Sequence, residues 1–229
     1  MKRHAAPVYW PIARKKQKFV VRPSPGPHGK NAMPLAVILR DALGYAENMK
    51  DAKSILNNGI VKVNGVVRKT ENFPVGLMDI LSLSDNEHYR MMPAKNGMGL
   101  KKITDKNVRL AKVMRKTINR GSKIQLSLHD GTSIITKDSN IKTGDVLVFD
   151  SQDSSVKNVL KMKKGALVVV IRGRNRGKTG LLEKIIITRS SQPNRAIIKV
   201  GKDEMEMPND FLFVIGEDKP LIEMGDNNE

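Results

Sequence analysis

Residues 59–69 read Gly59-Ile-Val-Lys-Val-Asn-Gly-Val-Val-Arg-Lys69. An Asn-Gly pair between two β-branched runs is the strongest short-range signal for a β-hairpin, because both turn positions need a positive φ. We therefore expect strands on either side of Asn64-Gly65, joined by a type I′ turn. A further strand over Met78–Leu83 completes a compact unit that we place at residues 34–85.

Two helices are predicted before the hairpin. Apolar residues between positions 35 and 46 recur at helical spacing, and Pro34 suits the first turn of a helix. Asn48 is a suitable N-cap for a second helix, with Asp51 three residues later as a variant of the capping box. Gly59 is expected to end this second helix.

Residues 86–158 favour β-structure. The run Lys123–Leu128 alternates in polarity, a His-Asp-Gly turn follows, and Ser133–Thr136 returns. Another strand is expected at Val146–Phe149. The preceding segment leaves two alternatives, because residues 105–116 fit either a basic helix or an irregular strand.

The C-terminal part, residues 159–229, contains the pattern of a small β-barrel. A strand over Gly165–Ile171 leads into a basic glycine loop at residues 172–180. A second strand follows at Leu181–Thr188, and two more are expected at 196–200 and 211–215. Short strands at this density suit a small closed sheet.

The glycine loop is not a nucleotide-binding P-loop. A P-loop has four residues between its glycines and opens a helix. Here three residues separate Gly173 from Gly177, and the Ile-rich segment after Thr179 favours a strand. Nucleotide hydrolysis is therefore excluded as an interpretation.

The charge of the chain points to a polyanionic partner. The net charge is +18, and the first acidic residue is Asp41, after nine lysines and arginines. The segments 86–125 and 159–184 are also strongly basic, whereas the tail 185–229 is acidic. Because residues 1–33 combine this bias with five prolines, we expect an extended arm that becomes ordered only when nucleic acid neutralises it.

Several function classes are excluded by composition. The chain has no cysteine, and its four histidines show no ligand spacing, so we expect neither a metal nor another cofactor. The apolar run 166–171 is too short for a bilayer, and prolines interrupt the basic N-terminus, which argues against a secretory signal. Glu204 and Glu206 lie in the acidic tail without a partner histidine, so no catalytic residue is expected. We expect a soluble, cytoplasmic protein.

Two segments resemble known RNA-binding modules. The Gly59–Gly65 stretch after two short helices resembles the S4-type RNA-binding domain, and residues 165–182 resemble the KOW motif. Their order, together with Arg22-Pro-Ser-Pro-Gly-Pro-His28, Pro74-Val-Gly-Leu-Met-Asp-Ile80 and Asn209-x-Phe-x-Phe-Val-Ile-Gly216, resembles the archaeal and eukaryotic small-subunit ribosomal protein family S4e. The length resembles that of the archaeal members.

The resemblance implies an α+β, multi-domain, non-enzymatic constituent of the small ribosomal subunit. Its parts would be a basic extended arm (1–33), an S4-like domain (34–85), a central β-rich domain (86–158) and a KOW-type, SH3-like barrel with the tail (159–229). Its partners would be small-subunit rRNA and neighbouring ribosomal proteins, with no membrane, no small-molecule substrate and no homo-oligomer. Two other classes stay open: an RNA-modifying enzyme with an appended S4-like module, and a transcription or translation factor that uses the KOW-like barrel.

We predict RNA contacts in four groups. The first group belongs to the arm and the helix that follows it: Lys2, Arg3, Trp10, Arg14, Lys15, Lys16, Lys18, Arg22, His28, Lys30 and Arg40. The S4-like group is Lys50, Lys53, Lys62, Arg68 and Lys69. The central group is Lys101, Lys102, Arg109, Lys112, Arg115, Lys116 and Arg120. The glycine-loop group is Arg172, Arg174, Asn175, Arg176 and Lys178.

Several of these predicted contacts also have a simpler explanation that does not involve RNA. The basic arm could be a solvated tail, and Lys50 and Lys53 could simply be exposed helix residues. Trp10 and Phe19 could stack on bases or could instead dock the arm onto its own protein. His28 could stack on a base or be an exposed loop residue.

Overall fold

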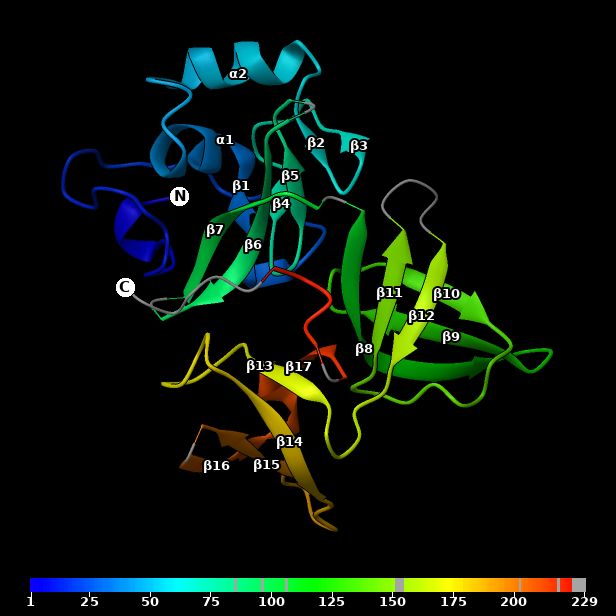
Figure 1. Ribbon diagram of the computed structural model, residues 1–229. Coiled ribbons are helices and arrows are strands. Elements are labelled where there is room, and N and C mark those ends of the chain that lie inside the picture. Colours follow the sequence, from blue (N-terminus) through cyan, green and yellow to red (C-terminus); the bar gives the residue numbers. More distant parts are fainter. Residues whose placement is uncertain are drawn as a thin grey trace. The chain divides into compact units, whose positions relative to one another are not determined.

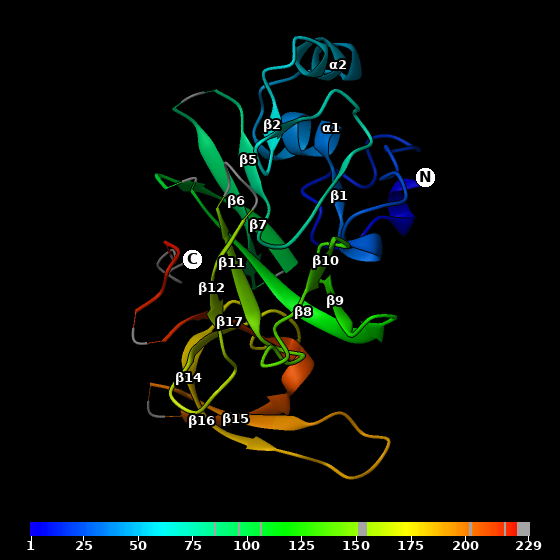
Figure 2. The same ribbon diagram turned by 90° about the vertical axis from the view of Figure 1, so that its right-hand side faces the viewer.

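The computed structural model describes residues 1–84, 86–95, 97–105, 107–150, 155–201, 203–217 and 219–223, and of Lys30 only the backbone. The chain divides into two compact units, residues 1–92 with 96–106 and residues 93–95 with 107–229. Strands dominate the described residues of both units (Figures 1 and 2). The α+β expectation therefore holds only in part, because the helices are few and short.

The first unit is built around the predicted hairpin. Strands β2 (Lys62–Val63) and β3 (Val66–Val67) pair across Asn64 and Gly65, whose φ values of 51° and 82° are those of the expected turn. The sheet continues in the order β3-β2-β5-β6-β7, with β5 at Ile80–Ser82, β6 at His88–Ala94 and β7 at Gly97–Ile103. The boundary that we placed at residue 86 thus falls inside this sheet.

The first predicted helix is shorter than expected. Helix α1 covers Leu35–Val37 and continues as a π-helical turn, η3, over Ile38–Ala42. Gly44 then takes a φ of 72°, which a helix does not permit, so the apolar repeat extends past the helix itself. The buried Leu35, Val37, Ile38 and Leu39 still belong to one hydrophobic core.

The second helix, α2, agrees closely with its prediction and covers Met49–Asn57. The Asn48 side-chain oxygen accepts hydrogen bonds from the backbone N–H groups of Lys50 and Asp51, at 2.8 and 3.1 Å. The Asp51 carboxylate in turn accepts from the Asn48 N–H. This reciprocal pair is the capping box, and it satisfies donors that would otherwise lack partners at the helix start.

The N-terminal segment is not an extended arm. It contains two 3-10 turns, η1 (Arg3–Ala5) and η2 (Gly29–Asn31), and leads into β1 (Met33–Pro34), which pairs with β4 (Pro74–Val75). Three of its apolar residues, Trp10, Ile12 and Val20, are buried in the core that also holds Leu35 and Val61. The expectation that charge prevents a core here was wrong, because the lysines face outward while these apolar residues face the unit.

A buried carboxylate connects this segment to the hairpin. Asp79 Oδ1 accepts from the Asn64 side-chain amide at 2.7 Å, and Oδ2 accepts from the Gly76 N–H at 2.9 Å. His28 Nε2 lies 2.7 Å from the same Oδ2, and both side chains are 4% exposed. A Cβ on Gly76 would lie within 2.1 Å of the His28 ring, so glycine is required for this contact.

In the second unit, the first sheet has the strand order β10-β9-β8-β11-β12. Its strands are β8 (Val108–Asn119), β9 (Lys123–Leu128), β10 (Ser133–Thr136), β11 (Val146–Asp150) and β12 (Val156–Leu160). The predicted strands at 123–128, 133–136 and 146–149 are confirmed. Strand β8 settles the open alternative for residues 105–116 in favour of a strand, with a bulge between Val113 and Arg115.

The second sheet of this unit has the order β16-β15-β14-β13-β17. Its elements are β13 (Leu167–Val170), β14 (Thr179–Ile186), β15 (Arg195–Val200), β16 (Asp203–Pro208), the turn η4 (Asn209–Phe211) and β17 (Leu212–Gly216). A strand, not a helix, follows the glycine loop. Strand β16 was missed because its acidic residues resemble a solvated tail, although they lie along the sheet edge opposite β15.

Replacing Asp79 by Ala is expected to lower the free energy of unfolding of the first unit by about 3–5 kcal/mol. The change leaves the Asn64 amide, the Gly76 N–H and the His28 ring facing a site without an acceptor. Urea unfolding monitored by fluorescence of Trp10, which is buried in this unit, measures the effect.

The matched control is Glu47→Ala, which removes an exposed carboxylate from the same unit. Its effect should stay within about 0.5 kcal/mol. Equal effects of the two substitutions would show that Asp79 does not anchor the unit.

Candidate nucleic-acid interface

Two arginines of the N-terminal segment are used inside the protein. The Arg3 guanidinium is buried and donates to the Ala13 and Phe19 carbonyls and to the Gln17 side chain. Arg14 donates to the Pro7 carbonyl at 2.7 Å. Each guanidinium thus fixes a loop of the segment, so these two residues hold the surface in shape.

The other bases of the segment face solvent. Lys2, Lys15, Lys16, Lys18 and Arg22 are exposed, and within the described part of the chain none of the five forms an ion pair. The Lys18 ammonium lies 5.5 Å from the centre of the Phe19 ring, and this ring is itself 60% exposed. Exposed cations without counter-charge beside an exposed ring suit a phosphate backbone with unstacked bases.

The remaining predictions for the segment differ in outcome. Trp10 is buried, so of the two alternatives the structure has the ring docked onto its own protein. His28 is neither exposed nor placed for stacking, because it faces Asp79. Arg40 forms a 2.7 Å ion pair with Asp41. The prediction for Lys30 concerns a side chain outside the described residues.

The hairpin presents a mixed basic and apolar surface. Lys62 and Lys69 are exposed, and so are Val66 and Val67 of β3. The Arg68 guanidinium lies 4.4 Å from the centre of the Phe73 ring, which is close enough for a cation–π contact. The exposed lysines of such a hairpin can contact the phosphates along a groove of RNA.

The other bases of this unit differ in whether they form an ion pair with an acidic side chain. Lys50 is exposed at the start of α2, whereas Lys53 forms a 3.0 Å ion pair with Glu71. The pKa of Glu71 is lowered, first by a backbone hydrogen bond and then by Lys53. Lys102 pairs with Glu87 at 3.6 Å, and Lys101 is half-buried.

Three bases of strand β8 have internal partners. Arg109 forms an ion pair with Asp130 and lies over the Phe149 ring. Burial raises the pKa of Asp130, but Arg109 and the hydrogen bonds from Thr132 outweigh it and hold the pKa below its usual value. Lys116 donates to the Ser139 and Ile141 carbonyls, at 2.7 and 2.8 Å.

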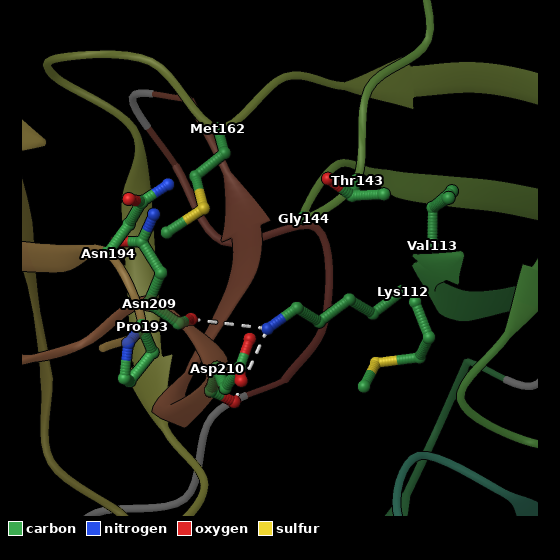
Figure 3. A pocket seen from close by; sticks show the side chains of 10 residues that line it. Lys112, Val113, Thr143, Gly144, Met162, Pro193, Asn194, Asn209 and Asp210 are labelled. Atoms are coloured by element: carbon green, nitrogen blue, oxygen red, sulfur yellow. Dashed lines mark hydrogen bonds between the residues drawn. The ribbon is translucent and has the colours of Figure 1, made fainter. Parts of the chain in front are cut away.

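Lys112 is the most deeply buried base that we predicted as an RNA contact. Its ammonium donates to the backbone carbonyl of Leu212 at 2.7 Å. It also donates to the carbonyls of Asn209 and Asp210, at 3.3 and 3.4 Å (Figure 3). Burial lowers the pKa of Lys112 to about 8, an effect that Asp210 opposes and Arg172 reinforces. Lys112 therefore ties the two sheets of the second unit together.

Arg115 and Arg120, by contrast, are exposed along β8 and the turn that follows. The turn places Gly121 and Ser122 at φ values of 77° and 57° and leads to Lys123, another exposed base. Sequence reasoning left Lys123 out, although its position beside Arg120 in the basic block was a usable signal.

The glycine loop is a tight β-connection that displays cations. The Gly177 N–H donates to the Val170 carbonyl at 2.8 Å, and the Val170 N–H donates to the Lys178 carbonyl at 3.0 Å, so the loop closes on its strands. Gly173 and Gly177 take φ values of 86° and 85°, which favour glycine. The loop exposes Arg172, Arg174 and Lys178, whereas Asn175 and Arg176 are half-buried.

The basic connection between β12 and β13 was also missed. Lys161 and Lys164 are exposed there, and Lys163 pairs with Glu217 at 2.8 Å.

Within the described residues, no group of three or more His, Asp and Glu side chains could hold a metal ion. No helix among the residues that the structure describes is long and apolar enough to cross a membrane.

Family models match successive parts of the chain. The RS4NT domain matches residues 1–31, the S4 domain residues 33–81, the ribosomal family S4e residues 85–156 and the KOW motif residues 164–199.

Relatives match over nearly the whole length. The small ribosomal subunit protein eS4 of Methanothermobacter thermautotrophicus is 39% identical over 98% of this chain and 95% of its own. The protein of the same name from Archaeoglobus fulgidus is 38% identical over 98% of this chain and 97% of its own. The crystal structure of the 30S ribosomal protein S4e from Thermoplasma acidophilum has a TM-score of 0.72 and 32% identity, covering 82% of this chain and 96% of that one.

The buried ammonium of Lys112 predicts a specific pH dependence of stability. Because its pKa is about 8 in the folded protein and near 10.5 when exposed, the unfolded chain binds the extra proton between these values. Wild-type stability should therefore rise with pH across this window relative to Lys112→Met, by roughly 3 kcal/mol at about 1.4 kcal/mol per pKa unit.

Urea unfolding followed by circular dichroism, at pH values below 8 and near 10.5, measures this difference. The Met114→Leu variant, which changes a neighbouring position of β8 without removing a charge, serves as the control and should show the wild-type profile. Parallel pH profiles for wild type and Lys112→Met would contradict the burial of the Lys112 charge.

Proposed function

This chain belongs to the ribosomal S4e family, and we propose that it is a structural constituent of the small ribosomal subunit, where it binds rRNA and neighbouring ribosomal proteins. Relatives named small ribosomal subunit protein eS4 match 98% of the chain at 38–39% identity. The S4 domain and the KOW motif support an RNA-binding role. As a ribosomal protein it acts in translation, in the cytoplasm, and it is not an enzyme.

The observation that carries the proposal is that many of the predicted contact bases are exposed and have no acidic partner among the described residues. These bases are Lys2, Lys15, Lys16, Lys18, Arg22, Lys50, Lys62, Lys69, Arg115, Arg120, Arg172, Arg174 and Lys178. Neutralising phosphates with such cations releases counterions, which drives binding without sequence readout. The buried or paired bases, among them Arg3, Lys112 and Arg109, would support the surface from inside.

We propose that the four parts of the chain each contribute contacts to one rRNA. The segment 1–33 would supply the acid-free lysines, residues 34–85 the hairpin, residues 86–158 the β8 arginines and residues 159–229 the glycine loop. Distributing contacts over several small modules suits double-stranded RNA, whose shape and backbone are read across the minor groove.

A factor that only cycles on and off the ribosome is the alternative that the KOW-like barrel keeps open. The two roles differ in occupancy. A structural constituent stays on small subunits at one copy each through a salt wash, whereas a cycling factor is recovered substoichiometrically.

Retention on small subunits tests the role of the exposed cations. We compare tagged wild type with Lys15→Ala/Lys16→Ala/Lys18→Ala, which removes three uncompensated charges without touching the core. Each lost phosphate contact weakens the electrostatic binding, so we expect severalfold lower occupancy after a wash at moderate salt, measured by quantitative mass spectrometry of purified subunits.

The matched control is Lys157→Ala/Lys163→Ala/Arg195→Ala, which removes three bases that pair with Asp150, Glu217 and Glu206. This variant should remain at the wild-type level. Equal loss in both triple variants would contradict the assignment of the contacts, and substoichiometric wild type would favour a cycling factor.

A further inference from the structure

The N-terminal segment exposes one aromatic ring that its own core does not use. Phe19 is 60% exposed, and it alone is exposed among the five phenylalanines of the chain, all of which lie in the described residues. Trp10 and Val20 of the same segment are buried in the hydrophobic core, whereas the Phe19 ring does not belong to that core. A single exposed apolar side chain is common on proteins, so the backbone beneath the ring and the charges beside it must decide what the ring binds.

The backbone that carries the ring is fixed from both sides. Lys2 and Phe19 form an antiparallel bridge, and the Arg3 N–H donates to the Lys18 carbonyl at 3.0 Å. The buried Arg3 side chain donates to the Phe19 carbonyl, and the next residue, Val20, is anchored in the core. A ring with two side-chain torsions on a fixed backbone loses little conformational entropy when a ligand covers it.

The neighbours of the ring are cations. The Lys18 ammonium lies 5.5 Å from the ring centre. Lys2 is the bridge partner of Phe19, and side chains that lie directly opposite each other in an antiparallel pair share one face. Both lysines are exposed, and among the described residues neither forms an ion pair. Residues 1–40 contain no Asp or Glu, so this surface favours an anionic partner.

A ring beside two uncompensated cations matches a nucleotide better than an apolar protein surface. An apolar surface that covered Phe19 would also desolvate Lys2 and Lys18 without supplying a counter-charge, which is costly. A nucleotide supplies both parts, because every base has a flat face that stacks on an aromatic ring and each phosphate attracts an ammonium group. Bases inside a double helix are covered by their neighbours, so the base must come from a loop or a bulge.

We infer that Phe19 is a stacking platform for one unpaired base of the bound RNA, with the Lys2 and Lys18 ammonium groups on the adjacent phosphates. The inference rests on the proposed function, because the base would come from the rRNA. Stacking releases no counterions, so this contact adds to the binding free energy a part that does not depend on salt.

The affinity of the full chain for small-subunit rRNA, measured at several salt concentrations, tests the inference. Phe19→Ala should weaken binding by roughly 5- to 150-fold at every salt concentration, as expected for the loss of one base–aromatic stack. The slope of log affinity against log salt should stay at the wild-type value, whereas Lys18→Ala should reduce it by about one. Unchanged affinity of Phe19→Ala, or a slope reduced as much as in Lys18→Ala, overturns the inference.

Three further variants separate stacking from bulk and from folding. Phe19→Leu keeps an apolar side chain without a flat ring and should bind as weakly as Phe19→Ala, whereas Phe19→Tyr should bind like wild type. Val8→Ala is the matched control, because Val8 is an apolar residue of the same segment that is 85% exposed, and it should also bind like wild type. Urea unfolding followed by Trp10 fluorescence should give the same midpoint for all variants, since the Phe19 ring lies outside the core.

The Leu and Tyr variants decide the outcome even if the Ala variant is destabilised. Wild-type affinity in Phe19→Leu would show that no stacking takes place. If the Phe19 variants bind purified rRNA normally but occupy small subunits less, a neighbouring protein covers the ring and the inference is wrong.

Binding by wild type separates this inference from the proposed function. If wild type binds small-subunit rRNA and the Phe19 variants bind it equally well, the stacking inference fails and the function stands. If wild type binds no small-subunit rRNA, the function itself fails, and the inference fails with it.

Discussion

The chain carries more positive charge than its own acids can neutralise, and the fold leaves this imbalance at the surface. Several acids are consumed internally: Asp79, Asp130 and Asp145 are all buried, where each accepts hydrogen bonds from backbone or side-chain donors. Carboxylates used as internal acceptors cannot screen lysines outside. A polyanion stabilises a protein built this way, because it relieves the repulsion among the surface cations.

Some bases bind backbone carbonyl groups of the protein itself and are therefore not available for RNA. Arg3 and Lys112 donate to backbone carbonyls and are almost completely buried. Their hydrogen bonds connect loops and sheets that a small hydrophobic core alone would hold together less firmly. Lys116 does the same nearer the surface. The cost of burying such charges is offset by the hydrogen bonds that each of these cations donates. The basic composition thus supplies an internal scaffold and, in the function that we propose, an external interface.

Local signals predicted the local structure well. Asn64-Gly65 specified the turn and Asn48 the start of α2, because both act through their own backbone neighbourhoods. Tertiary packing was not readable in the same way. The burial of Trp10 depends on a core formed by distant segments, and β16 depends on pairing with β15, which its acidic composition hides. For the predicted interface, charge density alone could not separate exposed Lys15 from buried Lys112.

Because the N-terminal segment packs into the core, deleting it is not a clean test of whether its charge binds RNA. Deleting residues 1–33 would remove Trp10 and Val20 from the core, so loss of binding would not report on charge alone. The direct measurement is the binding constant of the intact protein for small-subunit rRNA as a function of salt. With six to ten phosphates neutralised, affinity should fall by about 10³–10⁵-fold between about 50 and 200 mM salt. An affinity that stays constant over that range would contradict the claim that the uncompensated cations bind RNA.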